Sequence, residues 1–321
     1  MEIGAKQKER TARGGKGAPL ILYLKRNCLD DGPGIRTTVF FKGCPLSCVW
    51  CHNPESKSAK PELSFDPEKC IGCRTCIYTC KRKAVSLDYH EYVDRAKCNL
   101  CFKCVEECPT QAMDRMGAPA EAEEILEVIK KDIPFYKTSG GGLTLSGGEP
   151  TLYMQFCAAL LTEAKALGVH TLLETCGDFD LAKFRSTMYP RLDAVYFDIK
   201  LIDKEQHNKY CGAGNARILD NFRRLAQLSR EGGAALLPRV PLVPGITDTD
   251  ENLAGIAWFL RGCGIEEIAL LPYNPTWLKK TGMLGKAKEY EFSKWMPAAE
   301  IARCRARFEG FKLNGEGRKN I

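Results

Sequence analysis

The sequence predicts an α/β fold: a parallel sheet of six strands with helices between them, and a small cysteine-rich unit inserted near its start. Three observations support this prediction. From about residue 120 onward, short apolar segments alternate with longer amphipathic ones, which is the order of parallel βαβ units with right-handed crossovers. One further apolar segment precedes them, at 34–44. Between the two parts lies a stretch, 65–115, that is rich in Cys and Lys and has little periodicity.

The six predicted strands are short and rich in β-branched, aliphatic and aromatic residues. They cover 34–44, 141–150, 169–177, 192–200, 234–245 and 266–274. The segments between and after the later strands have apolar residues at helical spacing. The predicted helices cover 122–137, 154–167, 180–188, 216–233, 248–264 and 293–311.

Six strands are too few to close an eight-stranded barrel, so the sheet is expected to be an open partial barrel or a doubly wound sheet. In both folds, functional residues gather at the carboxyl ends of the strands. Here those ends carry Gly, Pro or polar residues, whereas the strand bodies do not. Their sequences are KGC, SGGEP, ETCG, DIK, RVPLVPG and PYN. This asymmetry predicts one shared site at one mouth of the fold.

The composition is typical of a soluble globular protein, with 44% hydrophobic and 27% charged residues. No apolar run approaches the ~20 residues that a membrane-spanning helix needs. Residues 1–18 are basic and glycine-rich and contribute to the net charge of +7. Because they lack an apolar segment, we expect a disordered lead-in rather than a signal peptide. No stripe of Lys and Arg interleaved with aromatic residues indicates nucleic-acid binding. We therefore expect a cytoplasmic protein that binds neither a membrane nor nucleic acid.

Cysteine is the most unusual feature of the composition, at 17 residues. In a chain without a secretion signal, clustered cysteines indicate metal or redox chemistry more often than disulfides. Eleven of them form three groups between Cys44 and Cys108. The others stand alone and are expected to be small buried hydrophobic residues: Cys28, Cys157, Cys176, Cys211, Cys263 and Cys304.

Two of the groups repeat the pattern C-x2-C-x2-C-x3-C, the signature of two-cluster ferredoxins, in which the fourth cysteine of each run binds the other cluster. One cluster is therefore assigned to Cys70, Cys73, Cys76 and Cys108, and the other to Cys98, Cys101, Cys104 and Cys80. Zinc is the alternative, but it prefers paired C-x2-C knuckles with a longer gap between them. We expect residues 65–115 to be a domain held together by two 4Fe-4S clusters, which relay electrons.

The third group, Cys44, Cys48 and Cys51, has the spacing C-x3-C-x2-C and lies just after the first strand. Three thiolates bind three irons of a cube and leave the fourth iron open. An open iron can coordinate a substrate or a cofactor directly, like the vacant position of a catalytic zinc site. The other eight clustered cysteines form two full sets between themselves, so the missing fourth ligand indicates a vacancy that serves catalysis.

The motif from Cys44 to Cys51, with Trp50 before its last cysteine, resembles that of the radical S-adenosylmethionine (SAM) enzymes. More narrowly, DDGPGIRTTVFFKGCPLSCVWCHNPE, SGGEP and FDIK resemble segments of the glycyl radical enzyme activating enzymes, and the two-cluster insert is similar to that of one subgroup. The resemblance covers about residues 20–310. It implies a partial (β/α)6 radical SAM barrel over 19–64 and 116–321, interrupted by the ferredoxin-like insert at 65–115.

The resemblance also implies which residues bind SAM. Those expected along the adenosyl group are Trp50, Cys51 and His52. SGGEP resembles the methionine-binding turn of the family, where Gly147 and Gly148 let the backbone approach closely and Glu149 accepts from the ammonium group. The DIK segment matches a D-x-K motif whose lysine meets the SAM carboxylate; its residues are Asp198, Ile199 and Lys200.

Simpler interpretations stay open for several of these residues: an ordinary glycine turn, a plain ion pair in DIK and a solvated loop histidine at His52. Asp31 matches a family position near the bound target peptide, although it is also a normal residue for an Asp-Gly turn.

Two positions depart from some family members. Glu174 stands where those members have an Asp that, with the equivalent of Asp198, holds a monovalent cation beside SAM, which leaves open whether the cation is kept. Asn274 replaces a His; it can still hydrogen-bond the adenosyl moiety but cannot titrate.

The activity that the resemblance implies is reductive cleavage of SAM to methionine and a 5′-deoxyadenosyl radical. This radical removes a hydrogen atom from a backbone glycine of a partner glycyl radical enzyme. A low-potential donor such as flavodoxin or ferredoxin supplies the electrons. We expect an anaerobic, monomeric enzyme whose open barrel admits the glycine loop of the partner. The alternatives are a radical SAM enzyme that acts on a small molecule and a non-catalytic electron carrier.

Overall fold

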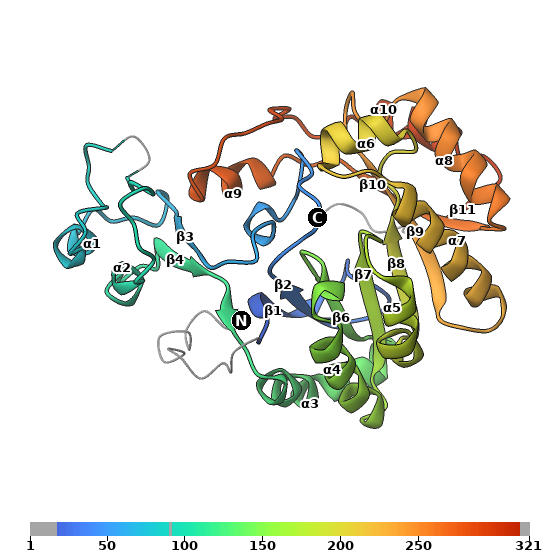
Figure 1. The fold of residues 1–321 in the computed structure, drawn as a ribbon, viewed down its shortest axis with the longest axis horizontal. Helices are drawn as coiled ribbons and strands as arrows, with labels where there is room; N and C mark the ends of the chain where they lie inside the picture. The colour runs from blue at the N-terminus through green and yellow to red at the C-terminus, as the bar shows by residue number, and fades with distance from the viewer. Residues whose placement is uncertain (1–17, 90–91, 315–321) are drawn as a thin grey trace.

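The computed structural model describes residues 18–89 and 92–314 (Figure 1). Its main element is a nine-stranded sheet in the order β11-β10-β9-β8-β7-β6-β2-β1-β5. The predicted lead-in at 1–18 lies almost entirely outside the described residues. Across the residues described, every helix is too short or too polar to span a bilayer.

Six parallel strands form the centre of this sheet, as predicted. They are β2 (Arg36–Phe41), β6 (Gly142–Gly147), β7 (His170–Thr175), β8 (Ala194–Asp198), β9 (Ala235–Leu242) and β10 (Glu267–Pro272). Each strand pairs in parallel with the next one in this series. The order runs in one direction, without the reversal that defines a doubly wound sheet. The open partial barrel is therefore the correct alternative.

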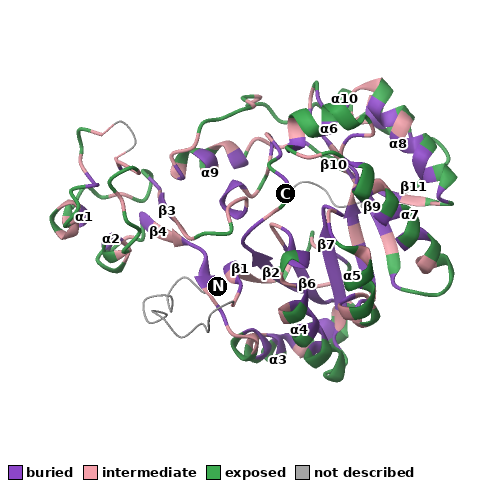
Figure 2. Ribbon diagram, in the orientation of Figure 1, coloured by how far each residue is buried: buried purple, intermediate pink, exposed green. Residues whose placement is uncertain are grey.

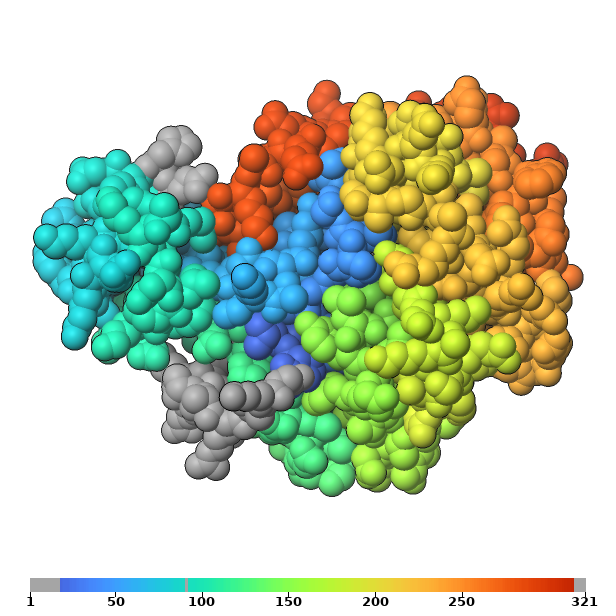
Figure 3. Space-filling model, viewed as in Figure 1, coloured from blue at the N-terminus to red at the C-terminus, as the bar shows by residue number. Residues whose placement is uncertain are grey.

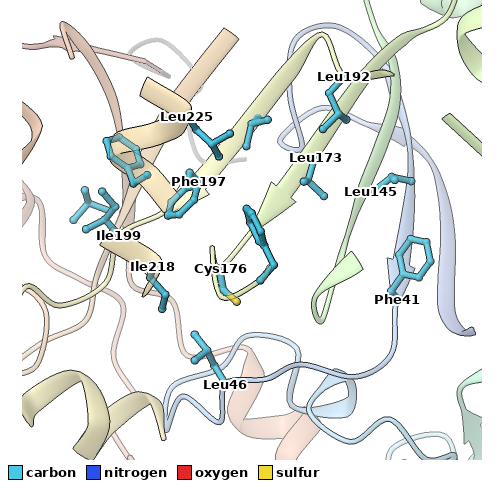
Figure 4. Packing of buried hydrophobic residues seen from close by; sticks show 14 of the residues in the cluster. Phe41, Leu46, Leu145, Leu173, Cys176, Leu192, Phe197, Ile199, Ile218 and Leu225 are labelled. Atoms are coloured by element: carbon cyan, nitrogen blue, oxygen red, sulfur yellow. The ribbon is translucent and has the colours of Figure 1, made fainter. Parts of the chain in front are cut away.

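Helices follow the strands and bury an apolar face against the sheet. The predicted helices are confirmed as α3 (Ala122–Ser139), α4 (Met154–Ala166), α5 (Leu181–Thr187), α7 (Ala216–Arg230), α8 (Asp250–Gly262) and α10 (Ala298–Ala306). Figure 2 shows that burial is concentrated in the strands and on the facing sides of these helices. Figure 4 shows the resulting packing, with Leu173 and Phe197 of the sheet near Leu225 of α7.

Among the described residues outside 65–115, two short helices were not predicted, α6 (Lys204–Cys211) and α9 (Trp277–Met283). The same is true of β1 (Leu20–Cys28), which is antiparallel to β2, and of the two-residue strands β5 (Ala118–Pro119) and β11 (Lys312–Leu313). The predicted strand at 34–44 is therefore preceded by another strand. In β1 the apolar run passes into charged residues, because an antiparallel strand near a sheet edge is not buried on both faces.

Residues between β3 (Glu62–Phe65) and β4 (Met113–Met116) form a separate lobe at one end of the molecule (Figures 1 and 3). The two strands pair antiparallel at its base, so the lobe begins slightly before the predicted boundary at 65. It contains two short helices, α1 (Thr75–Thr79) and α2 (Lys103–Glu106), at matching places in the two cysteine runs.

The internal repeat of the lobe extends to its backbone conformation. Three residues of the first run have positive φ, and each has a counterpart with positive φ at the same place in the second run. The pairs are Gly72 and Leu100, Arg74 and Phe102, and Lys83 and Gln111. Non-glycine residues seldom adopt this conformation. The two runs therefore impose the same chain path, although their sequences differ between the cysteines.

Charged contacts join the lobe to the barrel. Lys42, which directly follows β2, is fully buried and pairs with Glu62 at the start of β3 at 2.6 Å. Lys286, beyond α9, pairs with the same Glu62 at 2.6 Å, and Lys280 of α9 pairs with the buried Glu55 at 3.1 Å. These contacts fix the start of the lobe against the segment that follows the first cysteine motif.

Asp132 joins α3 to the first two strands. Its side chain is buried and accepts hydrogen bonds from Arg26 Nε of β1 at 2.9 Å and from Thr37 Oγ1 of β2 at 2.6 Å. Tyr136, one turn later on α3, donates to the same Thr37 hydroxyl at 2.5 Å. The network holds β1 in place although it has few neighbours on its other edge.

Replacing Asp132 with Ala should lower the free energy of unfolding by about 2–3 kcal/mol, because Arg26 and Thr37 would lose a buried partner. Anaerobic urea unfolding monitored by tryptophan fluorescence measures the change. Glu127→Ala is the matched control on α3, since the exposed Glu127 pairs with the exposed Lys130 of its own helix; it should unfold like the parent protein. An equal loss in the two variants would contradict the proposed role of the network.

Candidate active site

The three cysteines of the C-x3-C-x2-C motif lie on one loop that leaves the carboxyl end of β2. Cys48 is buried, and Cys44 and Cys51 are half-buried against the barrel core. The loop is closed at its base, where Gly43 N–H donates to Ser56 O at 2.7 Å. The structure therefore places the three cysteines on one loop at the predicted mouth of the barrel.

The C-terminal end of α6 holds the middle of this loop. The last carbonyl groups of a helix lack partners within the helix. Here Cys211 O accepts from Ser47 N–H at 2.8 Å, and Tyr210 O accepts from Val49 N–H at 3.0 Å. Gly212 follows in the left-handed conformation (φ 78°), which ends the helix at this point. The end of α6 thus fixes the path of the chain between the cysteines.

The SGGEP turn lies directly against the base of the cysteine loop. Gly148 N–H donates to Phe41 O and Glu149 N–H donates to Gly43 O, both at 2.8 Å. The two segments approach so closely that a Cβ on Gly148 would lie 2.0 Å from Gly43 O. A side chain at this position would therefore push the turn away from the cysteine loop.

Glu149 is fully buried, and its carboxylate joins several segments of the site. Its oxygens accept from Cys176 N–H at 2.7 Å, from Thr175 Oγ1 at 2.9 Å and from Thr151 Oγ1 at 2.8 Å. Burial raises the pKa of Glu149, and the hydrogen bonds from Cys176 and Thr151 oppose this rise. We expected this carboxylate to accept from the ammonium group of SAM. In the structure its oxygens are occupied within the protein and none is exposed.

Four charged side chains meet where β7, β8 and β9 end. Arg239 of β9 donates to Asp198 Oδ1 from Nε at 2.8 Å and also pairs with Glu174. Lys200 Nζ donates to Asp198 Oδ2 at 3.2 Å. Ser146 Oγ, near the end of β6, donates to Glu174 Oε2 at 2.6 Å. The structure thus brings together three predicted site residues, Glu174, Asp198 and Lys200, and adds Arg239.

These charges control one another's protonation. Burial by itself would raise the pKa of Asp198, but the charges of Arg239 and Lys200 outweigh it, and the pKa is lowered. Burial would lower the pKa of Lys200, but Asp198 together with the nearby thiols of Cys48, Cys176 and Cys211 outweighs it, and the pKa is raised. Burial raises the pKa of Glu174. Lys200 therefore stays protonated at neutral pH and can meet a ligand carboxylate. Ile199, between the two charged residues of DIK, is buried and packs in the core.

The other residues expected near the adenosyl group lie on the side of the mouth next to β10. Trp50 is buried in the core, whereas His52 is exposed. The His52 ring meets the Tyr273 ring edge-on, with 6.2 Å between centroids. The neighbouring Asn274 is half-buried, and its Oδ1 accepts from Thr276 Oγ1 at 2.6 Å. His52 thus contacts Tyr273, the residue directly before Asn274.

Asp31 lies in the loop between β1 and β2. Its Oδ2 accepts from Thr38 Oγ1 at 2.9 Å, and its backbone O accepts from Thr144 Oγ1 at 2.8 Å. Thr37 contacts α3 on the outside of the sheet, so Thr38 faces the opposite, inner side. Asp31 is therefore held against the inner face of β2 and β6.

The eight cysteines of the lobe surround two cavities. The first is lined by Cys70, Cys73, Cys76 and Cys108, and the second by Cys80, Cys98, Cys101 and Cys104. These are the two sets expected when the fourth cysteines are exchanged between the runs. Ala84 N–H donates to Cys80 Sγ at 3.3 Å and Met113 N–H donates to Cys108 Sγ at 3.5 Å. Thiols that receive such N–H groups fit an iron–sulfur cluster, whose potential depends on hydrogen bonds to its sulfurs.

The thiols of the lobe are spread around their cavities rather than gathered at a point. Among the described residues, no three His, Cys, Asp or Glu side chains are close enough to hold a single metal ion. Apolar side chains such as Phe65 in the first cavity and Val85 in the second line the remaining walls. Four thiols around an apolar hollow fit a cluster of several irons.

Sequence reasoning missed Arg239 and the helix that ends at Cys211. Arg239 lies in the strand-end segment RVPLVPG, and a charged side chain in an otherwise apolar strand is the signal that could have identified it. Helix α6 has no apolar stripe, but its end signals are present. Asp203 accepts from Gln206 N–H at 2.7 Å as an N-cap, and Gly212 follows its last residue.

Two isolated cysteines also belong to the site. The backbone O of Cys211 accepts from Ser47 N–H in the cysteine loop, and Cys176 N–H donates to the Glu149 carboxylate. Both residues are buried, as expected, but their surroundings are not only apolar. No sequence pattern indicates these contacts, because the partners are far apart along the chain.

Comparison with known proteins identifies the family of this site. Residues 38–255 match the family model of the Radical SAM superfamily, and this range includes the cysteine loop, the SGGEP turn and the charged ends of β7, β8 and β9. The chain belongs to the radical SAM superfamily. Membership implies a 4Fe-4S cluster and SAM, and a loop with three thiols beside a protonated lysine fits both groups.

Curated relatives and a solved structure agree with this assignment. The isethionate sulfite-lyase activating enzyme of Desulfovibrio desulfuricans is 38% identical over 299 residues, which cover 91% of this chain and 92% of that protein. The trans-4-hydroxy-L-proline dehydratase activating enzyme of Clostridioides difficile is 36% identical over 92% of this chain and 98% of that protein. A radical SAM methyltransferase from Sphaerobacter thermophilus shares the fold, with a TM-score of 0.51 at 13% identity over 92% of this chain and 76% of that chain. The resemblance to the activating enzymes is confirmed.

Replacing Gly148 with Ala should weaken SAM binding by at least roughly tenfold, equivalent to about 1.4 kcal/mol. The added Cβ would separate the SGGEP turn from Gly43 and displace both the turn and the cysteine loop. Anaerobic equilibrium dialysis of the reconstituted protein with labelled SAM measures the affinity.

Gly262→Ala provides the matched control, because a Cβ at Gly262 would meet nothing within 4 Å. This variant should bind SAM like the parent protein. If Gly148→Ala bound SAM equally well, the close approach of the two segments would not matter for the ligand.

Proposed function

We propose that this protein activates a partner glycyl radical enzyme. The observation that carries the proposal is the meeting of a three-thiol loop, a glycine turn and the Asp198–Lys200 pair at one mouth of a radical SAM barrel. The two relatives described above cover 91% and 92% of this chain, and both are named activating enzymes. When bound, the cluster and SAM supply the chemistry: reductive cleavage of SAM gives a 5′-deoxyadenosyl radical that takes hydrogen from a backbone glycine of the partner.

The residues of the chain hold and orient these groups. In this proposal Cys44, Cys48 and Cys51 ligate three irons and leave one iron for the amino and carboxylate groups of SAM. Lys200 binds the SAM carboxylate, and Asp198 keeps Lys200 charged and in place. Trp50, His52 and Asn274 border the adenosyl group.

The backbone of Gly147 and Gly148 takes over the contact with the methionine end, because the Glu149 carboxylate is occupied by Thr151, Thr175 and Cys176. Arg239 pairs with both Glu174 and Asp198, and Lys200 pairs with Asp198. Two cations thus already balance the two carboxylates, so the proposal needs no monovalent cation there.

We further propose that the lobe is a ferredoxin-like domain with two 4Fe-4S clusters, which relays electrons from a low-potential donor such as flavodoxin or ferredoxin. The two thiol-lined cavities support this role. So do the contacts of α9, where Lys280 donates to the backbone O of His52 at 3.0 Å next to the third motif cysteine. The lobe and the cysteine loop are thus attached to the same helix.

The partner is proposed as a class of enzyme rather than as one enzyme. The two relatives have nearly equal identity to this chain, yet their names refer to different lyase and dehydratase partners. The sheet does not close, and Asp31 on its inner face is where we propose that the glycine loop of the partner enters. A site made from one chain suits a monomer, and its oxygen-sensitive groups suit an anaerobic cytoplasm.

Incubation of the reduced, reconstituted protein with SAM and a glycyl radical enzyme should give 5′-deoxyadenosine and a glycyl radical on the partner. The partner's electron paramagnetic resonance (EPR) spectrum would then contain the glycyl doublet. Cys44→Ala should abolish both products, because it removes one ligand of the site cluster. Cys304→Ala is the control for loss of a buried thiol away from the loop and should retain both.

The two products, 5′-deoxyadenosine and the glycyl radical, show which part of the proposal is wrong if the experiment fails. If SAM is cleaved but no partner from any tested class acquires the radical, the protein acts on another substrate. If Cys44→Ala still cleaves SAM, the assignment of the site cluster is wrong.

The exchange of fourth cysteines in the lobe predicts a specific pattern of iron loss. Cys70→Ala combined with Cys108→Ala should remove one cluster, because both residues belong to the first cavity. Cys70→Ala combined with Cys80→Ala should remove two clusters, because Cys80 belongs to the second cavity. Iron and acid-labile sulfide per chain measure the difference. The reverse pattern, with two clusters lost in the variant that lacks Cys70 and Cys108 and one lost in the variant that lacks Cys70 and Cys80, would mean that each run binds its own cluster.

A further inference from the structure

The two halves of the lobe follow the same chain path but differ in charge after their last cysteine. The first cysteine run is followed by Lys-Arg-Lys at 81–83, and the second is followed by Pro-Thr-Gln at 109–111. The backbones match at this point, since φ is 50° at Lys83 and 57° at Gln111. The difference between the halves therefore lies in their side chains.

The exchange of fourth cysteines places these cations at the second cavity. Arg82 lines the cavity that contains Cys80, together with Lys103, the first residue of α2. At the first cavity the position equivalent to Arg82 is Thr110, and Arg74 is the one charged residue among the described residues that line it. The second cavity is thus the more basic of the two.

The cations around the second cavity are exposed, and we call these four residues the basic rim: Lys81, Arg82, Lys83 and Lys103. Within residues 18–89 and 92–314, no carboxylate forms an ion pair with any of them. The nearby Lys97, in contrast, is paired with Asp94 at 3.1 Å. The acidic residues at the end of α2, Glu106 and Glu107, do not line the cavity. The charge of the basic rim is therefore available to a partner.

The second cavity reaches the surface inside the basic rim. Cys101 is exposed, and the side chain of Leu100 beside it is 37% exposed. Figure 1 shows α2, which begins at Lys103, on the part of the lobe turned away from the barrel. The first cavity also has an exposed cysteine, Cys73, and an exposed apolar residue, Ile71. The charge of the surroundings is what distinguishes the two cavities.

An apolar contact surrounded by cations fits the usual anatomy of a protein interface, with a less polar centre and a charged rim. Cations without intramolecular partners attract an acidic protein, orient it and disfavour a basic one. A carrier bound here has its redox group next to the exposed Cys101. One electron then passes from the reduced carrier, which is oxidised, to the group held by the four cysteines of the second cavity, which is reduced.

We propose that the basic rim and Leu100 form a docking surface for an acidic electron-carrier protein, and that electrons enter the lobe at the second cavity rather than at the first. The inference rests on the proposed function, since it requires a cluster in each cavity of the lobe. It adds the point of entry and the charge of the donor.

The test measures binding of an acidic flavodoxin to the full-length reconstituted protein by anaerobic isothermal titration calorimetry. Arg82→Glu should weaken binding at low salt by at least roughly threefold, because it replaces an attractive charge with a repulsive one. The rate constant for the first electron from reduced flavodoxin, followed by stopped-flow absorbance, should fall by a similar factor. The affinity of the parent protein should decrease as salt is raised, since salt screens exposed charges.

Arg74→Glu is the matched control, because it makes the same change of charge at an exposed residue that lines the first cavity. This variant should bind flavodoxin almost like the parent protein. Lys103→Glu changes the basic rim from the other cysteine run and should behave like Arg82→Glu. Where Arg82→Glu contains less iron than the parent protein, Lys103→Glu decides.

Three outcomes would overturn the inference. Equal affinities of Arg82→Glu and Arg74→Glu would mean that the basic rim has no special role. A larger loss in Arg74→Glu would place the entry point at the first cavity. Absence of binding to the parent protein at low salt, with an acidic ferredoxin as well as with flavodoxin, would mean that the lobe does not receive such a carrier.

Failure of the inference and failure of the proposed function give different results. Dithionite reduces the protein without a carrier, so SAM cleavage with dithionite and the iron content of the parent protein test the proposed function separately. If the parent protein cleaves no SAM or holds no clusters in the lobe, the proposed function fails. If it does both but the variants bind flavodoxin alike, only the docking surface is wrong.

Discussion

The buried carboxylate of Glu149 is the interaction on which the rest of the site depends. A carboxylate without access to water must find hydrogen-bond donors inside the protein. Glu149 obtains them from Thr151 in its own turn and from Thr175 and Cys176 at the end of β7, while its N–H donates to Gly43 before the cysteine loop. One residue, through its side chain and its backbone N–H, thus joins the ends of three neighbouring strands. The positions of the motif thiols relative to the glycine turn follow from this arrangement.

The charges at the mouth have a similar effect on ligand binding. Asp198 is paired with Arg239 and Lys200, and Glu174 is paired with Arg239 and hydrogen-bonded to Ser146. Loss of one member would leave an uncompensated charge in a partly buried place, so the set is strongly interdependent. A zwitterionic ligand such as the methionine end of SAM would meet a site whose charges are already balanced. Such a site needs little reorganisation when the ligand binds.

Much of the fold could be predicted from the sequence, because long elements have a clear apolar period. The six parallel strands and the helices that follow them are of this kind. The elements that were missed, β1, α6 and α9, are charged, polar or short, and they depend on tertiary contacts rather than on their own periodicity. For β1 the contact is Arg26 with Asp132, and for α6 it is the pairing of its last carbonyls with the cysteine loop. The rule that functional residues gather at the carboxyl ends of the strands located the site. It did not identify Arg239, nor did it show that Glu149 accepts hydrogen bonds from within the protein.

By itself, the sequence determined the six parallel strands and the helices that follow them, where the strand ends gather and which family the cysteine spacing indicates. Those features depend on residues close together in the chain, whose spacing sets local geometry. Only the tertiary structure decided that Glu149 is an internal hydrogen-bond acceptor, that Arg239 joins Glu174 to Asp198, and that the last carbonyls of α6 hold the cysteine loop. These contacts join residues far apart in the chain. The packing of the strands decides which buried donor meets which acceptor. No local pattern in the sequence indicates these pairs.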